Sequence, residues 1–146
     1  MPRNVAILLF DEVEVLDFAG PFEIFSVAGN RKGEVAPFNV YTVAAKAGSI
    51  SARNKLIVIP HYTLDSCPPP DLIVVPGGYG SRSAMRDPAV LSWVRRQHET
   101  TELTLSVCTG ALILAAAGLL AGMRATTHHG ACELLELISI YENVRH

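Results

Sequence analysis

The sequence lacks several features that mark common classes of protein. Lys and Arg number 12 against 14 Asp and Glu, so the formal net charge of −2 offers no basic surface for nucleic acid or an anionic membrane. The apolar run 111–123 is shorter than the ~20 residues that cross a bilayer. Acidic residues interrupt the apolar run 5–10 before it could serve as a signal peptide. We therefore expect neither nucleic acid nor a membrane as a partner of this chain.

Cysteine is scarce, and its count is odd: the chain has three, Cys67, Cys108 and Cys132. An odd count without a secretory signal predicts free thiols in a reducing compartment, and hence a cytoplasmic protein, rather than a disulfide framework. No C-x-x-C pair and no H-x-x-x-H spacing is present, so the sequence predicts no metal site.

What the chain does contain is ample material for a core, with 49% apolar and 18% charged residues in 146 positions. This length and composition predict one compact domain over residues 1–146. Short apolar runs typical of buried strands alternate with helical patterns, which predicts an α/β fold with a mainly parallel sheet and helices on both faces. We expect strands at 5–10, 38–43, 71–75 and 103–107, a short extra strand at 55–59, and helices at 21–28, from 87 onward, at 109–117 and at 132–140.

Cys108 occupies the most informative position, between the predicted strand 103–107 and a helix rich in small residues. Unpaired N–H groups and the positive end of the dipole at a helix N-terminus favour the thiolate, which is the nucleophilic form of cysteine. The alternative is a buried cysteine that acts only as a small hydrophobic residue. Ligands of parallel sheets bind at the carboxyl ends of the strands, where residues 11–17, the Gly77–Gly78 pair and Cys108 all fall. This convergence favours a reactive thiol.

Acidic and imidazole groups are the candidates for moving protons near the thiol. Asp17 lies amid apolar neighbours, and burial would raise its pKa and suit it to proton transfer, unless it only caps a helix that starts near Pro21. Glu23 competes with Asp17 but falls on the expected helix surface. His128 is a further candidate because a Cys–His pair is one route to thiolate activation, although a histidine in a loop is more often structural.

Two glycines and a threonine are the candidates for holding negative charge. Gly77 and Gly78 permit close approach of the backbone and could present N–H groups to an oxyanion, although Pro-Gly-Gly is also an ordinary turn at a strand end. Thr109 could add a backbone N–H and a hydroxyl to the site, or merely cap the helix that follows.

These residues together resemble the DJ-1/PfpI superfamily, whose members are related to class I glutamine amidotransferase domains. Within the superfamily, the resemblance is closest to the isonitrile hydratase branch and to the sensory halves of AraC-type regulators. The blocks that carry it are 16–21 (LDFAGP), 71–78 (DLIVVPGG), 106–111 (SVCTGA), 117–122 (AGLLAG) and 124–128 (RATTH).

The resemblance implies a flavodoxin-like three-layer sandwich in which Cys108 is the nucleophile on a strained turn. Asp17 would be its acidic partner, Thr109 a second polar group, and Gly77 and Gly78 the backbone on the oxyanion side. It further implies a small-molecule substrate, no cofactor and a homodimer. In the hydratase branch, water adds across an isocyanide to give an N-substituted formamide. Peptidase-like members carry histidine where this chain has Thr109, so we do not expect a protease.

The chain departs from the family pattern in two places. His129 stands where the hydratase branch usually has tryptophan, which implies a more polar edge of the pocket. Family members continue beyond position 146 with a glycine-rich turn and a long helix, so we expect the chain to lack the family's C-terminal strand and helix. Two other functions fit the resemblance: a ligand-sensing domain like those fused to AraC-type DNA-binding modules, and a redox protein whose Cys108 is oxidised to a sulfinate.

Overall fold

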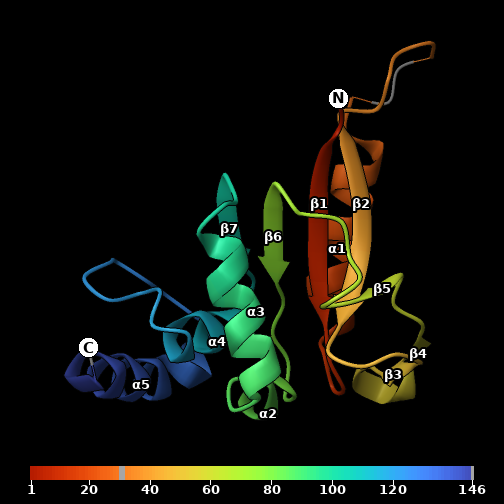
Figure 1. Ribbon diagram of the computed structural model, residues 1–146. Helices are drawn as coiled ribbons and strands as arrows, with labels where there is room; N and C mark the ends of the chain where they lie inside the picture. The colour runs from red at the N-terminus through yellow and green to blue at the C-terminus, as the bar shows by residue number, and fades with distance from the viewer. Residues whose placement is uncertain (30–31, 146) are drawn as a thin grey trace.

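The computed structural model describes residues 1–29 and 32–145, with side chains described as far as Ser139. Its centre is a five-stranded sheet in which all neighbouring strands pair in parallel, in the order β5-β2-β1-β6-β7 (Figure 1). This arrangement confirms the predicted α/β fold. The strands are β1 (Arg3–Leu9), β2 (Phe38–Ala44), β5 (Tyr62–Thr63), β6 (Leu72–Val75) and β7 (Leu103–Ser106).

A separate antiparallel hairpin lies between β2 and β5 in the sequence. Its strands are β3 (Ile50–Ser51) and β4 (Ile57–Val58), and a short 3-10 helix, η1 (Arg53–Lys55), stands between them. The extra strand predicted at 55–59 therefore exists in part, but it does not join the main sheet.

β1 occupies the middle of the sheet because its side chains are apolar without interruption. Residues 5–9 have no solvent exposure, as a strand covered on both faces requires. Full burial of a side chain of this kind is worth roughly 1.5–3 kcal/mol. β1 pairs with β2 on one side and with β6 on the other, so the loops that follow all three strands meet at one edge of the sheet.

Helices cover both faces of the sheet and complete the flavodoxin-like sandwich. On one face, α1 (Val15–Val27) packs Phe18 into a cluster with Ile7 and its neighbours on the strands. In Figure 1, α1 lies behind β1 and β2, whereas α3 lies on the viewer's side of the sheet. The helices of the second face are α2 (Ser81–Ala84), α3 (Pro88–His98), α4 (Gly110–Ala116) and α5 (Cys132–Arg145).

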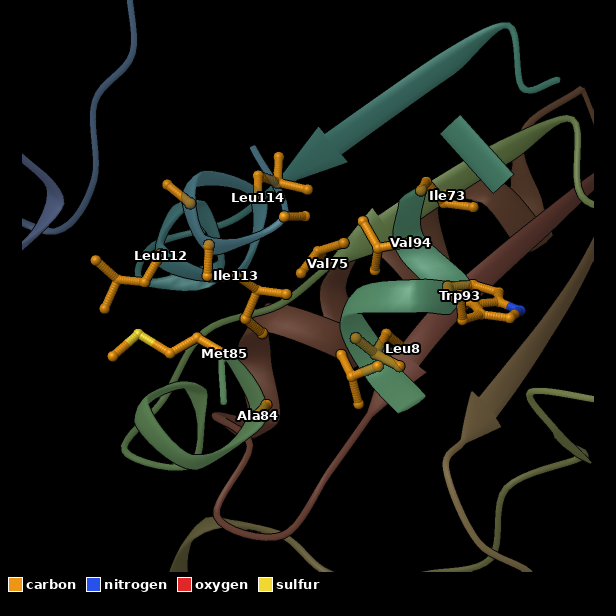
Figure 2. Close-up of a cluster of buried hydrophobic side chains, with 14 of the residues drawn as sticks. Leu8, Ile73, Val75, Ala84, Met85, Trp93, Val94, Leu112, Ile113 and Leu114 are labelled. Atoms are coloured by element: carbon orange, nitrogen blue, oxygen red, sulfur yellow. The ribbon is translucent and has the colours of Figure 1, made fainter. Parts of the chain in front are cut away.

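The core on the second face joins sheet and helices that are far apart in sequence. Figure 2 shows Leu8 and Val75 of the sheet together with Trp93 of α3 and Ile113 of α4, and none of these four side chains reaches solvent. α4 is buried over its whole length. The helix that follows Cys108 is therefore held firmly against the sheet.

The prediction that a helix begins at Pro21 is wrong. α1 begins six residues earlier, at Val15, with Glu14 at its N-cap and Pro21 inside the helix. Proline lacks an N–H group, so the carbonyl of Asp17 has no partner one turn later. Burial of Phe18 and the partly buried Phe22 against the sheet outweighs this loss. As a result, Asp17 lies in the first turn of a helix and not ahead of one.

The chain runs from β7 through α4 into an irregular segment and then into α5. Residues 124–127 form no strand, and in the described residues no strand follows β7. None of the helices in the described part has the length and hydropathy that a transmembrane helix requires.

Candidate active site

Cys108 lies on the turn between β7 and α4, at the carboxyl edge of the sheet. Its φ of 52° falls in the left-handed region that side chains other than glycine rarely adopt. The turn is held on both sides, because the N–H of Val107 donates to the carbonyl of Val75 at 3.0 Å and the N–H of Gly110 donates to the carbonyl of Val107 at 2.9 Å. The thiol is half-buried. Strain of this kind persists where the surroundings impose it, and it clusters at functional sites.

Thr109 is buried beside the cysteine and joins its turn to the loop after β6. Its hydroxyl oxygen accepts the N–H of Gly78 at 2.9 Å, and the hydroxyl lies 3.2 Å from the carbonyl of Gly78, to which it can donate. Ser81, which is fully buried, places its own hydroxyl 3.1 Å from Thr109 Oγ1 and 2.7 Å from the same carbonyl. Ser81 did not emerge from the sequence, because a serine directly after a glycine-rich turn gives no sign that it will be buried.

The two glycines allow this close contact. A Cβ atom on Gly77 would lie 2.5 Å from the backbone nitrogen of Thr109 and 2.6 Å from its hydroxyl oxygen. Gly78 has a φ of 116°, and a Cβ atom there would lie 2.5 Å from the nitrogen of Glu14. Real side chains do not come so close, so both positions require glycine. The loop after β6 therefore sits directly between α4 and the start of α1.

Asp17 points from the first turn of α1 toward this loop. Its carboxylate accepts the N–H of Gly77 at 3.1 Å. Burial raises the pKa of Asp17, and the nearby charge of Glu14 adds to the rise, while the hydrogen bond from Gly77 and the proximity of His128 oppose it. A carboxyl group with a raised pKa is suited to donate a proton and take one back.

Both glycine amides predicted to face an oxyanion already have acceptors. The N–H of Gly77 donates to Asp17, and that of Gly78 donates to Thr109. In this geometry the two amides fix the two polar side chains of the site. The backbone N–H of Thr109 itself, at the start of α4, has no acceptor in the described residues. A direct contact of Gly77 and Gly78 with negative charge stays a prediction.

The segment after α4 returns to the thiol. Thr127 donates its hydroxyl to the carbonyl of Cys108 at 3.0 Å, a contact that no sequence pattern had indicated. His128 follows, and it begins the 3-10 helix η2 (His129–Ala131) by accepting the N–H of Gly130 on Nδ1 at 3.1 Å. Its ring centroid lies 4.1 Å from that of His129. His128 also lies close enough to Asp17 to lower the pKa of that carboxyl.

The other sequence candidates lie elsewhere. Glu23 is exposed on α1, as the helical spacing predicted. Cys67 is half-buried, and burial raises the pKa of its thiol, whereas Cys132 is exposed. No group of three metal-ligating side chains converges within the described ranges 1–29 and 32–139. Cys108 is thus the cysteine beside the buried hydroxyl of Thr109 and the start of α4, and Thr109 in turn contacts the loop that holds Asp17.

The structure is a parallel α/β sandwich with a cysteine on a strained turn between a strand and a helix. These two features define the class of protein: α/β proteins with a thiol at the carboxyl edge of the sheet. The sequence model of the DJ-1/PfpI family matches residues 3–143, and the chain belongs to that family. The family resemblance read from the sequence blocks is therefore confirmed.

Three relatives illustrate the range of the family. The chain is 36% identical to isonitrile hydratase of Pseudomonas putida over 135 residues, which cover 92% of this chain and 56% of the hydratase. It is 28% identical to the HTH-type transcriptional regulator CdhR of Pseudomonas aeruginosa, over 93% of this chain and 40% of the regulator. A ThiJ/PfpI family protein from Pseudomonas syringae of known structure superposes with a TM-score of 0.83 at 28% identity, covering 95% of this chain and 55% of the other.

The chain spans about half the length of these relatives, from 40% of the regulator to 56% of the hydratase. The matched part contains the thiol turn, the glycine pair and the acidic residue of α1. The activities of the complete relatives are therefore only proposals for this chain.

Proposed function

We propose that the chain is a cysteine-dependent hydratase of the DJ-1/PfpI family that adds water to an isocyanide and yields an N-substituted formamide. Two observations carry the proposal: the strained turn of Cys108, and the glycine pair that links its neighbour Thr109 to Asp17, with the N–H of Gly77 donating to the Asp17 carboxylate at 3.1 Å. The identity of 36% to isonitrile hydratase supports the same chemistry. Thr109, where peptidase-like members carry histidine, speaks against a protease.

In the first step the sulfur of Cys108 attacks the terminal carbon of R–N≡C. The carbon gains a proton from the Asp17 carboxyl, and the product is a thioimidate, R–N=CH–S–Cys108. The thiol proton replaces the one that Asp17 gave up. Burial raises the pKa of Asp17, which keeps a larger fraction of the carboxyl protonated and available as the donor.

In the second step water adds to the thioimidate carbon, while the reprotonated Asp17 carboxyl donates its proton to the nitrogen and takes one from the water. The tetrahedral adduct R–NH–CH(OH)–S–Cys108 then collapses to R–NH–CHO and releases the thiol. Negative charge that develops on the oxygen needs a fixed donor. The backbone N–H of Thr109, which has no acceptor in the described residues, can take this role. The N–H groups of Gly77 and Gly78 hold Asp17 and Thr109 in place for these steps.

The test is turnover of a simple alkyl isocyanide, followed as formation of the formamide. We expect Cys108→Ala to abolish turnover and Asp17→Asn to lower it about 10²–10⁴-fold, the usual contribution of a positioned acid–base group. Cys132→Ala is the matched control, since that thiol is exposed and outside the site. Unchanged rates in both site variants would contradict the proposal.

A ligand-sensing domain is the second candidate, and the similarity to CdhR over 93% of this chain favours it. In that case the same pocket would bind a small molecule without converting it. The discriminating result is saturable binding of a ligand that Cys108→Ala leaves intact, together with no formamide from any isocyanide. A redox role would instead appear as selective conversion of Cys108 to a sulfinate by peroxide, seen in the intact mass.

Three further properties belong to the proposal. Residues 1–146 act as a single DJ-1/PfpI-like domain, the chain works in the cytoplasm, and it forms a homodimer. The three free thiols support a reducing compartment. α1 exposes Leu16, Ile24 and Val27, which recur at helical spacing and would be covered in a dimer. Light scattering of the purified chain measures its mass directly, and a monomer at all concentrations would contradict the dimer.

A further inference from the structure

A second concave site lies at the carboxyl edge of the sheet, away from the thiol. It is a cavity of about 550 Å³ between the ends of β1 and β2 on one side and α2 and the start of α3 on the other. This volume falls in the range of small-molecule sites, roughly 300–1,000 Å³. Cys108, Asp17 and Thr109 do not line it. The proposed hydratase reaction makes no use of this cavity.

The inner wall of the cavity is apolar. Leu9, Phe10, Ile50 and Val90 contribute to it, and three of the four are buried in the surrounding core. Such a surface favours the apolar body of a ligand, at about 25 cal/mol per Å² removed from water. The apolar wall therefore favours an organic ligand over water or a simple ion.

The rim carries charges of both signs that have no partner of opposite charge. Lys46 lines the cavity, and so do Asp11 and Asp87, yet none of the three makes an ion pair within the described residues. Each aspartate uses one carboxylate oxygen to accept a backbone N–H, from Ser51 at 2.9 Å and from Ala89 at 2.9 Å, and this leaves the second oxygen for a ligand.

Hydrogen bonds and an ion pair hold Glu12, on the wall of the cavity that adjoins the loop after β6. Glu12, at a φ of 61°, donates its N–H to the carbonyl of Ser51 at 2.8 Å, and its own carbonyl accepts the N–H of Gly80 at 3.2 Å. Its carboxylate pairs with Arg53 at 3.1 Å, and the guanidinium of Arg53 lies 4.3 Å from the ring centre of Tyr79. The carboxylate of Glu12 is thereby occupied, unlike the three rim charges. A wall fixed in advance lowers the entropy lost on binding.

We propose that this cavity binds a small zwitterion with an apolar body, of the kind represented by a free apolar α-amino acid. Its ammonium group would face Asp11 and Asp87, its carboxylate would face Lys46, and its side chain would lie on the apolar wall. A simple amine would leave Lys46 unpaired, and a simple carboxylate would leave both aspartates unpaired. The zwitterion alone uses both signs of charge.

The test is a titration of the full ¹⁵N-labelled chain with L-phenylalanine, 2-phenylethylamine and 3-phenylpropanoate, followed by amide chemical shifts. We expect saturable shifts at Ala45, Lys46 and Ser83 with phenylalanine, and affinities lower by about tenfold or more for the two analogues that lack one charge. Equal binding of the amine and the amino acid would overturn the proposal, and so would shifts confined to the loop around Cys108. Absence of any saturable shift with all three probes would overturn it as well.

Matched variants distinguish the effect of the rim charges on binding from the effect of the net charge of the protein. Lys46→Gln and Asp11→Asn should each weaken phenylalanine binding about tenfold or more, while the amide side chain introduced by Asp11→Asn can still accept the N–H of Ser51. Lys55→Gln changes an exposed lysine outside the cavity and should leave binding unchanged. Ala45→Phe fills the cavity from an exposed position and should abolish binding. Equal losses in Lys46→Gln and Lys55→Gln would contradict the assignment of the rim.

Discussion

Substitution of Gly77 by alanine tests the packing of the thiol site most sharply. The added methyl group would lie 2.5 Å from the nitrogen of Thr109, 2.6 Å from its hydroxyl oxygen and 3.0 Å from the nitrogen of Gly110. Two of these atoms are backbone atoms, and the third belongs to a buried side chain, so none can turn aside. The loop after β6 would have to move away from α4.

The size of the effect follows from what this movement breaks. Forcing a methyl group into a packed site costs about 1–3 kcal/mol. Separation of the loop from α4 also removes the two hydrogen bonds between Gly78 and Thr109, worth about 0.5–1.5 kcal/mol each. We therefore expect Gly77→Ala to lower the free energy of unfolding by about 2–6 kcal/mol, and to release Asp17 from its partner.

The measurement is urea unfolding followed by circular dichroism, with Gly20→Ala as the matched control. Gly20 lies inside α1, and a Cβ atom there would meet nothing within 4 Å. The same substitution should therefore stabilise the protein at position 20 by about 0.5–1 kcal/mol, since alanine favours a helix. A loss below about 0.5 kcal/mol in Gly77→Ala, the size typical of surface substitutions, would refute the described contact between the loop and α4.

Three further predictions concern the groups around the site. Burial raises the pKa of Asp17, so the contribution of this residue to the free energy of unfolding is present at low pH and is lost as pH rises above 3.8. In urea unfolding across a pH series, Asp17→Asn should therefore gain stability relative to the parent chain above pH 3.8. A difference between the two proteins that does not change with pH would contradict this. Ser81→Ala removes a buried hydroxyl from Thr109 and should destabilise by about 1–3 kcal/mol in the same urea assay, whereas exposed Ser83→Ala should have little effect. Thr127→Val should increase hydrogen exchange in residues 124–130 and leave α3 unchanged, because it removes the bond to the Cys108 carbonyl.

The sequence predicted the sheet well because its strands carry an unambiguous signal. The uninterrupted apolar run at 5–9 could only be a strand buried on both faces, and the small-residue helix after Cys108 followed from composition alone. The start of α1 could not be predicted. Local preference places Pro21 at a helix start, and only the burial of Phe18 against a distant strand moves that start to Val15.

The hydrogen bonds around the candidate site residues could not be predicted from the sequence. Their positions after strand ends predicted that Cys108, Asp17 and the glycine pair lie at one edge of the sheet; in the structure Asp17 accepts the N–H of Gly77, and Gly77 lies against Thr109, the residue after Cys108. The hydrogen bonds of Ser81 and Thr127 to this site span 28 and 19 residues, and neither residue type marks such a role in sequence. The use of the glycine amides by Asp17 and Thr109 likewise depends on distances that only the folded chain sets.

The most direct measurement of the central claim is the rate at which iodoacetamide alkylates each cysteine of the folded chain near neutral pH, resolved by peptide mass. The account predicts that Cys108 reacts faster than the exposed Cys132, and that Cys67, whose pKa burial raises, reacts slowest. Denatured chain provides the control, since all three rates should then converge. A Cys108 that reacts no faster than Cys132 in the folded protein would contradict its assignment as the nucleophile.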